Sequence, residues 1–301
     1  LSEEPAAAQA ARRAREQLLA WHDRFSRFLP GSELSTLNAD PRAEVPVSPL
    51  MARLLEAVVW AGEFSGGLVD ATLVGEIERA GYAGHFESTS LPLAETLAAA
   101  PQRTQSAARA QARWREIDVN REAGTVRRPP GVRVDSGGLG KGLFADIVAE
   151  TLAPHASFAV DCGGDLRLGG AGEVERAVEV RSPFAGELLH TFARRGGGVA
   201  TSGIGKRSWR DGEGRPAHHL LDPATGRPAF TGVAQVTALA PTALEAEARA
   251  KAALLAGPAR AADWLAHGGV AVLDDGTVRV LEPPRSLTLG GVRVQLRPPS
   301  P

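Results

Sequence analysis

Cysteine is almost missing from this sequence, and its scarcity excludes the architectures that depend on it. Cys162 is the single cysteine among 301 residues, so neither an internal disulfide framework nor a thiolate metal cluster can form. An excess of charge of one sign is missing as well. The 34 basic and 35 acidic residues nearly cancel, which argues against a nucleic-acid partner and against a disordered acidic tail. No apolar run is long enough to span a bilayer, so we expect no transmembrane segment.

Lysine is the next scarce residue. Only Lys141, Lys206 and Lys251 occur among the 34 basic residues, so arginine is the usual cation of this chain. A lysine kept against that bias can supply a compact point charge, which the planar arginine side chain cannot. Chance is the alternative interpretation, but all three lysines fall in segments that other features single out.

The spacing of apolar residues predicts several helices. Ser48 offers an N-cap with Pro49 in the first turn, and Thr242 with Glu245 forms a capping box. We interpret 84–112 as a connection or small subdomain. The expected helices cover residues 6–28, 48–66, around 92–100, 141–152 and 242–256.

Short strands separated by turn residues follow Val132. Asp211-Gly212 and Asp275-Gly276 predict hairpin turns. Because adjacent strands are joined by such turns, we expect an α+β fold with mixed, largely antiparallel sheets flanked by helices. The length suits a single domain over 1–301 or two intertwined subdomains. The expected strands are 132–135, 157–161, 174–180, 188–193, 197–201, 217–221 and 232–240.

The first segment with chemical potential is Asp135–Gly142, a glycine-rich turn between a predicted strand and a helix. Exposed amides and a helix N-terminus favour phosphate, and glycines let a ligand approach the backbone. Leu143 follows Gly142, so the segment is not a Walker A loop, which needs Gly-Lys-Ser/Thr. Taken alone, it is equally well explained as a tight packing turn.

Two further segments carry glycines beside polar residues. In Asp161–Asp165, paired glycines follow a strand, and Asp165 can accept a bond from a hydroxyl or ring N–H, although a β-bulge is the simpler interpretation. In Gly198–Gly226, a Thr-Ser-Gly run leads to His219 and an Asp-Pro-Ala-Thr-Gly turn. His219 can act as a base or bind phosphate, or it can simply bond a nearby carbonyl.

The fourth segment is the helix 242–256. Glu247 and Lys251 lie four residues apart on one face. The spacing indicates an ordinary surface ion pair worth a few tenths of a kcal/mol. The functional alternative is a carboxylate aimed at a cation or at a phosphate-bound metal.

Together and in this order, these segments resemble the FAD:protein FMN transferase (ApbE) family. Each motif is short, but their common order is specific, and the resemblance covers about Phe25 to Gly257. The matching runs are Phe25–Phe28, Gly31–Ser35, Asn38, Gly67–Thr72, Asp135–Gly142, Gly163–Asp165, Thr201–Gly203, His219–Gly226 and Ala246-Glu247.

The resemblance implies a function and a set of site residues. The family moves FMN from FAD to a Thr or Ser of an acceptor protein, using Mg²⁺ and releasing AMP. It implies His219, Lys141 and Lys251 as catalytic residues and the Gly140 carbonyl with Glu247 at the metal. The expected FAD-binding residues are Phe28, Val69, Asp70, Ala71, Gly137, Gly138, Leu143, Asp165, Thr201, Ser202 and Leu221.

The sequence departs from the family pattern where the metal is expected. The family's helix usually reads Ala-Asp-x-x-x-Thr, but Glu247 and Lys251 stand at the two ligand positions here. A protonated lysine cannot coordinate Mg²⁺, so either Mg²⁺ binds differently or Lys251 neutralises the pyrophosphate. Ile204 and Gly205 replace the usual acidic or tyrosine residues after Thr-Ser-Gly, and the usual N-terminal Met-Gly-Thr strand is absent from this sequence.

The residues leave three functions open: the transferase, a pyrophosphatase that splits FAD into AMP and FMN, and a flavin-binding protein without transferase activity. The resemblance places the protein on the outer face of the bacterial cytoplasmic membrane. A cytoplasmic site remains the alternative, because no signal or lipid-anchor cysteine is visible.

Overall fold

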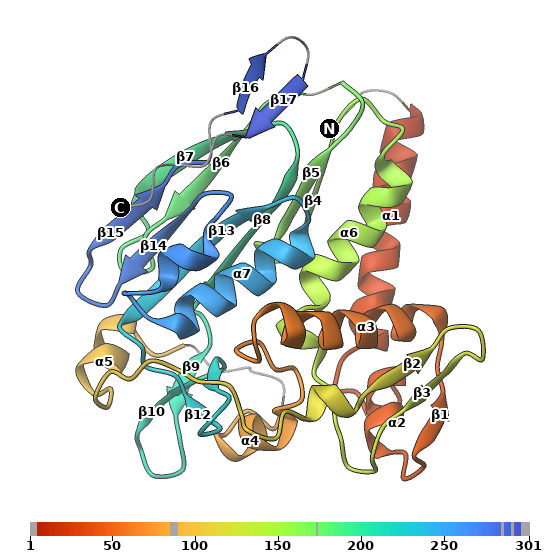
Figure 1. Ribbon diagram of the computed structural model, residues 1–301, viewed down its shortest axis with the longest axis vertical. Helices are drawn as coiled ribbons and strands as arrows, with labels where there is room; N and C mark the ends of the chain where they lie inside the picture. The colour runs from red at the N-terminus through yellow and green to blue at the C-terminus, as the bar shows by residue number, and fades with distance from the viewer. Residues whose placement is uncertain (1–4, 85–89, 173, 284–285, 290–291, 296–301) are drawn as a thin grey trace.

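A six-stranded antiparallel sheet forms the centre of the structure (Figure 1). The computed structural model describes residues 5–84, 90–172, 174–283, 286–289 and 292–295. The strand order is β15-β14-β13-β8-β5-β4, and every neighbouring pair is antiparallel. The strands are β4 (Phe158–Asp161), β5 (Leu166–Gly169), β8 (Gly197–Gly203), β13 (Val233–Ala240), β14 (Gly269–Leu273) and β15 (Val278–Leu281).

Both faces of this sheet are covered, so β13 is buried at every position. Helices α6 (Gly140–Leu152) and α7 (Ala243–Ala256) pack on one face. The hairpin of β6 (Arg176–Arg181) and β7 (Leu188–Arg194) packs on the other face and shares an apolar cluster with it. Apolar residues on both faces explain why β13 lacks the alternation of a half-exposed strand.

A mainly helical region lies against α6 and α7 (Figure 1). Its apolar cluster includes Leu143 and Phe144 of α6 and Ala248 of α7, so this region and the sheet region pack against the same two helices. Its elements are α1 (Pro5–Arg24), α2 (Glu33–Ala39), α3 (Pro49–Phe64) and the sheet β1-β3-β2, with β1 (Glu44–Pro46), β2 (Asp118–Asn120) and β3 (Thr125–Arg127).

Short elements complete the described chain. The remaining helices are α4 (Val74–Arg79) and α5 (Leu93–Ala98), with 3₁₀ turns η1 (Arg113–Glu116), η2 (Ser136–Gly138) and η3 (Ala261–Trp264). The remaining strands are β9 (Ser208–Arg210), β10 (Pro216–His218), β11 (Leu221–Asp222), β12 (Arg227–Pro228), β16 (Ser286–Leu289) and β17 (Val292–Gln295).

The structure confirms the predicted α+β class and most predicted elements. The Ser48 hydroxyl accepts a bond from the Met51 amide at 3.1 Å and begins α3. The Thr242 hydroxyl accepts from the Glu245 amide and begins α7. Helix α5 lies where the sequence predicted a helix around 92–100. The expected hairpin at Asp275-Gly276 joins β14 to β15. The hairpin at Asp211-Gly212 also forms, as the turn between β9 and β10.

Three predicted elements are wrong in extent or kind. The helix predicted over 6–28 ends at Arg24, because Phe25 turns into the core, where its ring centroid lies 5.1 Å from that of Phe144. The strand predicted over 217–221 is split into β10 and β11. The predicted strand 132–135 joins no sheet.

The Asn38 side chain explains why the segment 132–135 is extended without a partner strand. Its amide nitrogen donates to the Val134 carbonyl and its oxygen accepts from the Val134 amide, both at 2.8 Å. The Asp135 amide donates to the Ala71 carbonyl at 2.9 Å. The segment's alternating pattern therefore reflects burial between helix α2 and the loop at Ala71 rather than a place in a ladder. Helices α2 and α4 and the sheet β1-β3-β2 were not predicted.

Candidate active site

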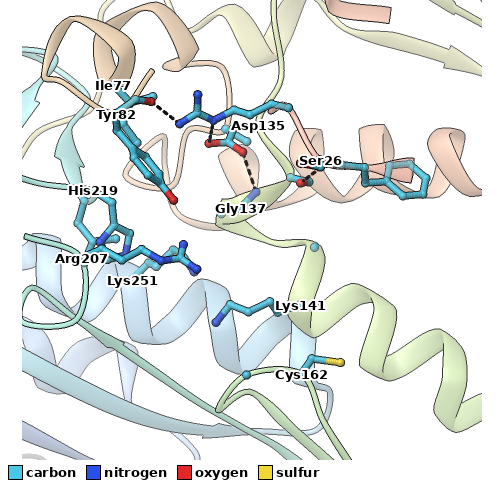
Figure 2. A pocket seen from close by; sticks show the side chains of 18 of the residues that line it. Ser26, Ile77, Tyr82, Asp135, Gly137, Lys141, Cys162, Arg207, His219 and Lys251 are labelled. Carbon is cyan, nitrogen blue, oxygen red and sulfur yellow. Dashed lines mark hydrogen bonds and ion pairs between the residues drawn. The ribbon is translucent and has the colours of Figure 1, made fainter. Parts of the chain in front are cut away.

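A cavity of about 650 Å³ lies where the helical region meets α6, α7 and the segment 206–221. Its volume is in the range of sites for small molecules and cofactors. All three lysines of the chain line it, and so do His219 and Arg207. Figure 2 shows Lys141, Lys251, His219 and Arg207. The lysines that the sequence retained against its arginine bias thus converge on one place.

The glycine-rich turn forms one border of this cavity. The Asp135 side chain accepts a bond from the Gly137 amide at 2.9 Å and caps η2. Arg27 fixes that carboxylate, with Nε 3.2 Å from Asp135 Oδ2, and also donates to the Tyr82 carbonyl at 2.6 Å. Arg27 therefore holds the turn through Asp135, and Gly137 and Gly138 line the cavity.

Two glycines of the turn have different tasks. A Cβ built on Gly138 meets nothing within 4 Å, and Gly138 lines the cavity, so its bare backbone is open to a ligand. A Cβ on Gly142 would lie 2.6 Å from the Ala243 carbonyl oxygen. Gly142 is therefore needed for the close approach of α6 and α7, as the packing interpretation expects, while the space at Gly138 is free for a ligand.

Two buried carboxylates hold two of the lysines at the edge of the cavity. Lys141 Nζ lies 2.5 Å from Asp165 Oδ2, and Lys251 Nζ lies 2.8 Å from Glu247 Oε1. Asp165 is 1% exposed and Glu247 is fully buried. Neither carboxylate lines the cavity, whereas both lysines do. The burial of Glu247 excludes the ordinary surface ion pair that the spacing indicated.

Charge and burial set the protonation of this cluster. Burial alone would lower the pKa of Lys141, but the Glu247 and Asp165 carboxylates outweigh it and raise that pKa. Lys141 is therefore a cation at neutral pH. Burial, followed by repulsion from Glu247, raises the pKa of Asp165 to about 6 despite the two lysines. Burial also raises the pKa of the Cys162 thiol to about 12, so this cavity-lining cysteine is not a thiolate nucleophile.

His219 lies beside these cations and is neutral. Burial, followed by the charges of His218, Arg207 and Lys251, lowers its pKa well below 6.5. Its Nδ1 is buried and has no hydrogen-bond partner among the described residues. A neutral imidazole with an unused nitrogen at a cavity edge can accept a proton. The neighbouring His218 is fully buried, and burial lowers its pKa to about 3.

Aromatic side chains also line the cavity, and Figure 2 shows Tyr82 across it from Lys141. The rings of Phe28 and Tyr82 meet edge to face at 5.4 Å, and Trp209 stacks behind Tyr82 at 5.5 Å. The Arg27 guanidinium lies 4.2 Å from the Phe28 ring centroid. We call Phe28, Tyr82 and Trp209 the aromatic wall, and Lys141, Arg207 and Lys251 with their carboxylates Asp165 and Glu247 the charged floor.

Asp70 adds a polar group to the cavity. Its Oδ1 accepts from the Thr72 amide at 2.8 Å and from the Thr72 hydroxyl. Its Oδ2 is buried without a partner among the described residues, and burial raises its pKa. A buried oxygen without a partner is costly, so Asp70 is suited to bond a ring N–H or a ribose hydroxyl of a ligand.

The structure brings most of the predicted site residues together. Those that line the cavity are Phe28, Val69, Asp70, Ala71, Gly137, Gly138, Gly140, Lys141, His219, Leu221 and Lys251. Leu143, Asp165, Thr201, Ser202 and Glu247 do not line it.

The predicted residues away from the cavity have supporting contacts. Leu143 is buried in the core of the helical region. Thr201 sits on β8, where its hydroxyl lies 2.8 Å from that of Thr237, and its amide donates to Asp165 at 3.3 Å. Ser202 is buried on the same strand. Of these residues, Thr201 contacts the charged floor, through Asp165.

Sequence reasoning missed Arg207 and Tyr82. Arg207 directly follows Lys206, one of the three scarce lysines. Its position beside Lys206 is the one sequence feature that could have indicated it. Tyr82 is the only tyrosine of the chain. It comes from a turn after α4, a helix that the sequence did not predict, so nothing local placed it at the cavity.

The cavity residues do not fit a magnesium ion of the kind that the resemblance implied. Both oxygens of Glu247 are engaged, because Oε2 accepts from the Gly142 amide at 2.8 Å and Oε1 accepts from Lys251. Lys251 is a cation donor and offers no ligand atom. Among the described residues, no three His, Cys, Asp or Glu side chains are grouped to hold a metal.

Comparison with known proteins places the chain in a family. The ApbE family model matches residues 3–273, so the chain belongs to the ApbE family. It is 26% identical over 266 residues to the FAD:protein FMN transferase of Escherichia coli strain K12, covering 86% of this chain and 72% of the relative. It is 29% identical over 248 residues to the same-named protein of Treponema pallidum, covering 75% of this chain and 65% of that relative.

Solved structures show the same fold. The chain matches the ApbE protein of Thermotoga maritima with a TM-score of 0.74 and 25% identity, over 93% of this chain and 91% of that one. It matches the Pseudomonas stutzeri flavinyl transferase ApbE with a TM-score of 0.70 and 21% identity, over 93% and 88%. At 21% identity, the second match shows a shared fold and nothing more. Within the described residues, no helix is both long enough and apolar enough to span a membrane.

Proposed function

We propose that this chain transfers FMN from FAD to a Thr or Ser hydroxyl of an acceptor protein and releases AMP. The observation that carries the proposal is the convergence of all three lysines and Arg207 on one cavity with an aromatic wall. Such a cavity matches a ligand with a charged pyrophosphate between two flat ring systems. Membership of the ApbE family and the transferase names of its relatives support the same reaction.

The reaction is a phosphoryl transfer in which atoms and charge balance. The acceptor hydroxyl oxygen attacks the FMN phosphorus and forms a phosphoester. The bond from that phosphorus to the bridging oxygen breaks, and AMP leaves with the oxygen. Such reactions need an in-line hydroxyl, a base and cations that spread the developing charge. The charged floor supplies cations through Lys141, Arg207 and Lys251.

His219 is the proposed base. It is neutral at pH 7 because burial lowers its pKa, and its Nδ1 is unused among the described residues. It takes the proton of the acceptor hydroxyl as the phosphorus–oxygen bond forms. Lys141 lies at the glycine-rich turn, where the pyrophosphate would meet the open backbone of Gly138.

The aromatic wall and Asp70 are proposed to bind rather than react. Phe28 and Tyr82 offer ring faces and edges that suit the isoalloxazine or adenine ring. Val69, Ala71 and Leu221 complete the apolar lining. The magnesium ion that the resemblance implied does not fit Glu247 and Lys251, so this proposal gives the metal no step.

The direct test incubates the full chain with FAD and an acceptor protein that carries a target threonine. The expected result is an acceptor mass gain equal to one FMN residue, with AMP released in equal amount. An acceptor with that threonine changed to alanine is the control and should gain nothing. AMP without acceptor labelling would show a pyrophosphatase instead. Retention of FAD with neither product would show a binding protein.

A further inference from the structure

We infer that Lys251 is a built-in replacement for a divalent cation, so that this chain transfers FMN without a metal. The inference deepens the proposed function and rests on it. It concerns one side chain, Lys251 on α7, whose ammonium group pairs with a buried carboxylate and lines the cavity.

The carboxylate that a metal would need already holds a cation. Glu247 is fully buried, and each of its two oxygens accepts one hydrogen bond, from the Gly142 amide and from Lys251 Nζ. A metal bound to Glu247 would share this carboxylate with the Lys251 ammonium. Two positive charges would then lie around one carboxylate in a buried site, where like charges repel strongly.

The position of Lys251 suits a cation that acts on a ligand. Glu247 does not line the cavity and Lys251 does, so the ammonium lies between its carboxylate and the ligand space. An ammonium group has three donors, and Glu247 uses one of them at 2.8 Å. The remaining N–H groups are available to the non-bridging oxygens of a pyrophosphate.

Close packing keeps this cation fixed. The Glu247–Gly142 bond ties α7 to the first turn of α6, and the two helices approach so closely that Gly142 has no room for a side chain. Lys251 is therefore held at a constant place relative to the glycine-rich turn. A fixed charge can stabilise a transition state without first reorganising.

Lys251 takes part in the reaction only through charge. Its ammonium donates hydrogen bonds to phosphate oxygens as negative charge moves to the leaving AMP, and it gives up no proton. The ion pair Lys141–Asp165 has the same arrangement as Lys251–Glu247, a cavity-lining ammonium on a buried carboxylate. Two lysine cations face the ligand, and their two carboxylates lie behind them in the protein.

The first test measures FMN transfer by the wild-type chain in excess EDTA and again in millimolar Mg²⁺. The inference predicts the same rate in both. A rate that EDTA abolishes and Mg²⁺ restores would overturn the inference while leaving the proposed function intact. Absence of transfer in both buffers would instead defeat the proposed function, and the second test then decides the nature of the cation site.

The second test is Lys251→Thr, which removes the ammonium and introduces a neutral oxygen beside Glu247. We expect transfer in EDTA to fall about 100-fold and Mg²⁺ to restore much of it. Independently of activity, Mg²⁺ should raise the thermal midpoint of this variant but not of the wild type, because a ligand stabilises only a protein that binds it. An Mg²⁺-dependent midpoint in the wild type would overturn the inference.

A double variant guards against a folding artefact. Glu247→Gln with Lys251→Met removes both charges and keeps the side-chain volumes, so it should fold and should lose activity that Mg²⁺ cannot restore. Arg53→Thr makes the same kind of change in the exposed pair Arg53–Glu150 and should leave the rate unchanged in both buffers. Wild-type activity in the double variant would also overturn the inference.

Discussion

The two sides of the cavity are built from different chemistry and on different scaffolds. The charged floor comes from α6, α7 and the loop before β9, and its lysines are braced by carboxylates that are almost completely buried. The aromatic wall comes from turns after α1 and α4, with Trp209 behind it on β9. The difference is that helices fix the two lysines of the floor, while Phe28, Tyr82 and Arg207 stand on turns and loops. We propose that the floor controls the rate of transfer and that the wall controls FAD affinity.

The largest expected effect comes from breaking the floor at Glu247. Glu247→Ala leaves Lys251 as a buried cation without its carboxylate, which typically costs about 3–5 kcal/mol of stability. Chemical denaturation measures the loss in free energy of unfolding. The double variant Glu247→Gln with Lys251→Met should stay near the wild type, because it removes both charges together. An equal loss in both variants would mean that packing, rather than charge, is responsible.

Changing the base should come next in size. His219→Gln is expected to slow FMN transfer about 100-fold, with FAD retained. Because burial keeps the pKa of His219 well below 6.5, the wild-type rate should stay level as pH falls past 6.5 and decline only in more acidic buffer. The pH profile of single-turnover transfer measures this. A decline centred on the ordinary histidine pKa would contradict the buried, neutral base.

The two glycines of the turn provide a matched pair of smaller effect. Gly142→Ala brings a Cβ within 2.6 Å of the Ala243 carbonyl oxygen and should cost about 1–3 kcal/mol of stability. Gly138→Ala meets nothing within 4 Å, so it should keep its stability and weaken FAD binding instead. Denaturation and FAD titration on both variants separate the two tasks. Equal changes in stability and FAD affinity for both variants would contradict the separate roles of Gly138 and Gly142.

The smallest effect is expected at the aromatic wall. Phe28→Ala removes a ring that packs edge to face against Tyr82 at 5.4 Å and should cost about 1 kcal/mol of FAD affinity. The transfer rate at saturating FAD should not change. Fluorescence titration with FAD gives the affinity. A slower rate at saturation would mean that the wall positions the reacting phosphate.

The sequence could predict the helix caps, the glycine-rich segments and two cavity lysines, because each depends on local signals. The caps at Ser48 and Thr242 and the order of glycine-rich segments required only neighbouring residues. The scarcity of lysine pointed to Lys141 and Lys251 before any contact was known. The burial of Glu247 could not be predicted, because its i,i+4 spacing from Lys251 is the same as that of a surface pair.

Long-range contacts explain what the sequence could not give. The extended segment at Val134 depends on the Asn38 side chain, which is 96 residues away. Tyr82 reaches the cavity from a turn after α4, and Arg207 reaches it from the loop before β9. Such side chains are placed by packing between distant elements, which leaves no periodic trace in the sequence.

The most direct test of the division between floor and wall compares Arg207→Gln with Phe28→Ala. Arg207 is exposed at the cavity edge, so its substitution should change charge without disturbing the core. The measurement is the single-turnover rate of FMN transfer at saturating FAD, together with the dissociation constant for FAD. The account predicts that Arg207→Gln slows transfer about tenfold or more with little change in the dissociation constant, and that Phe28→Ala does the reverse. Equal effects of both variants on rate and affinity would contradict it.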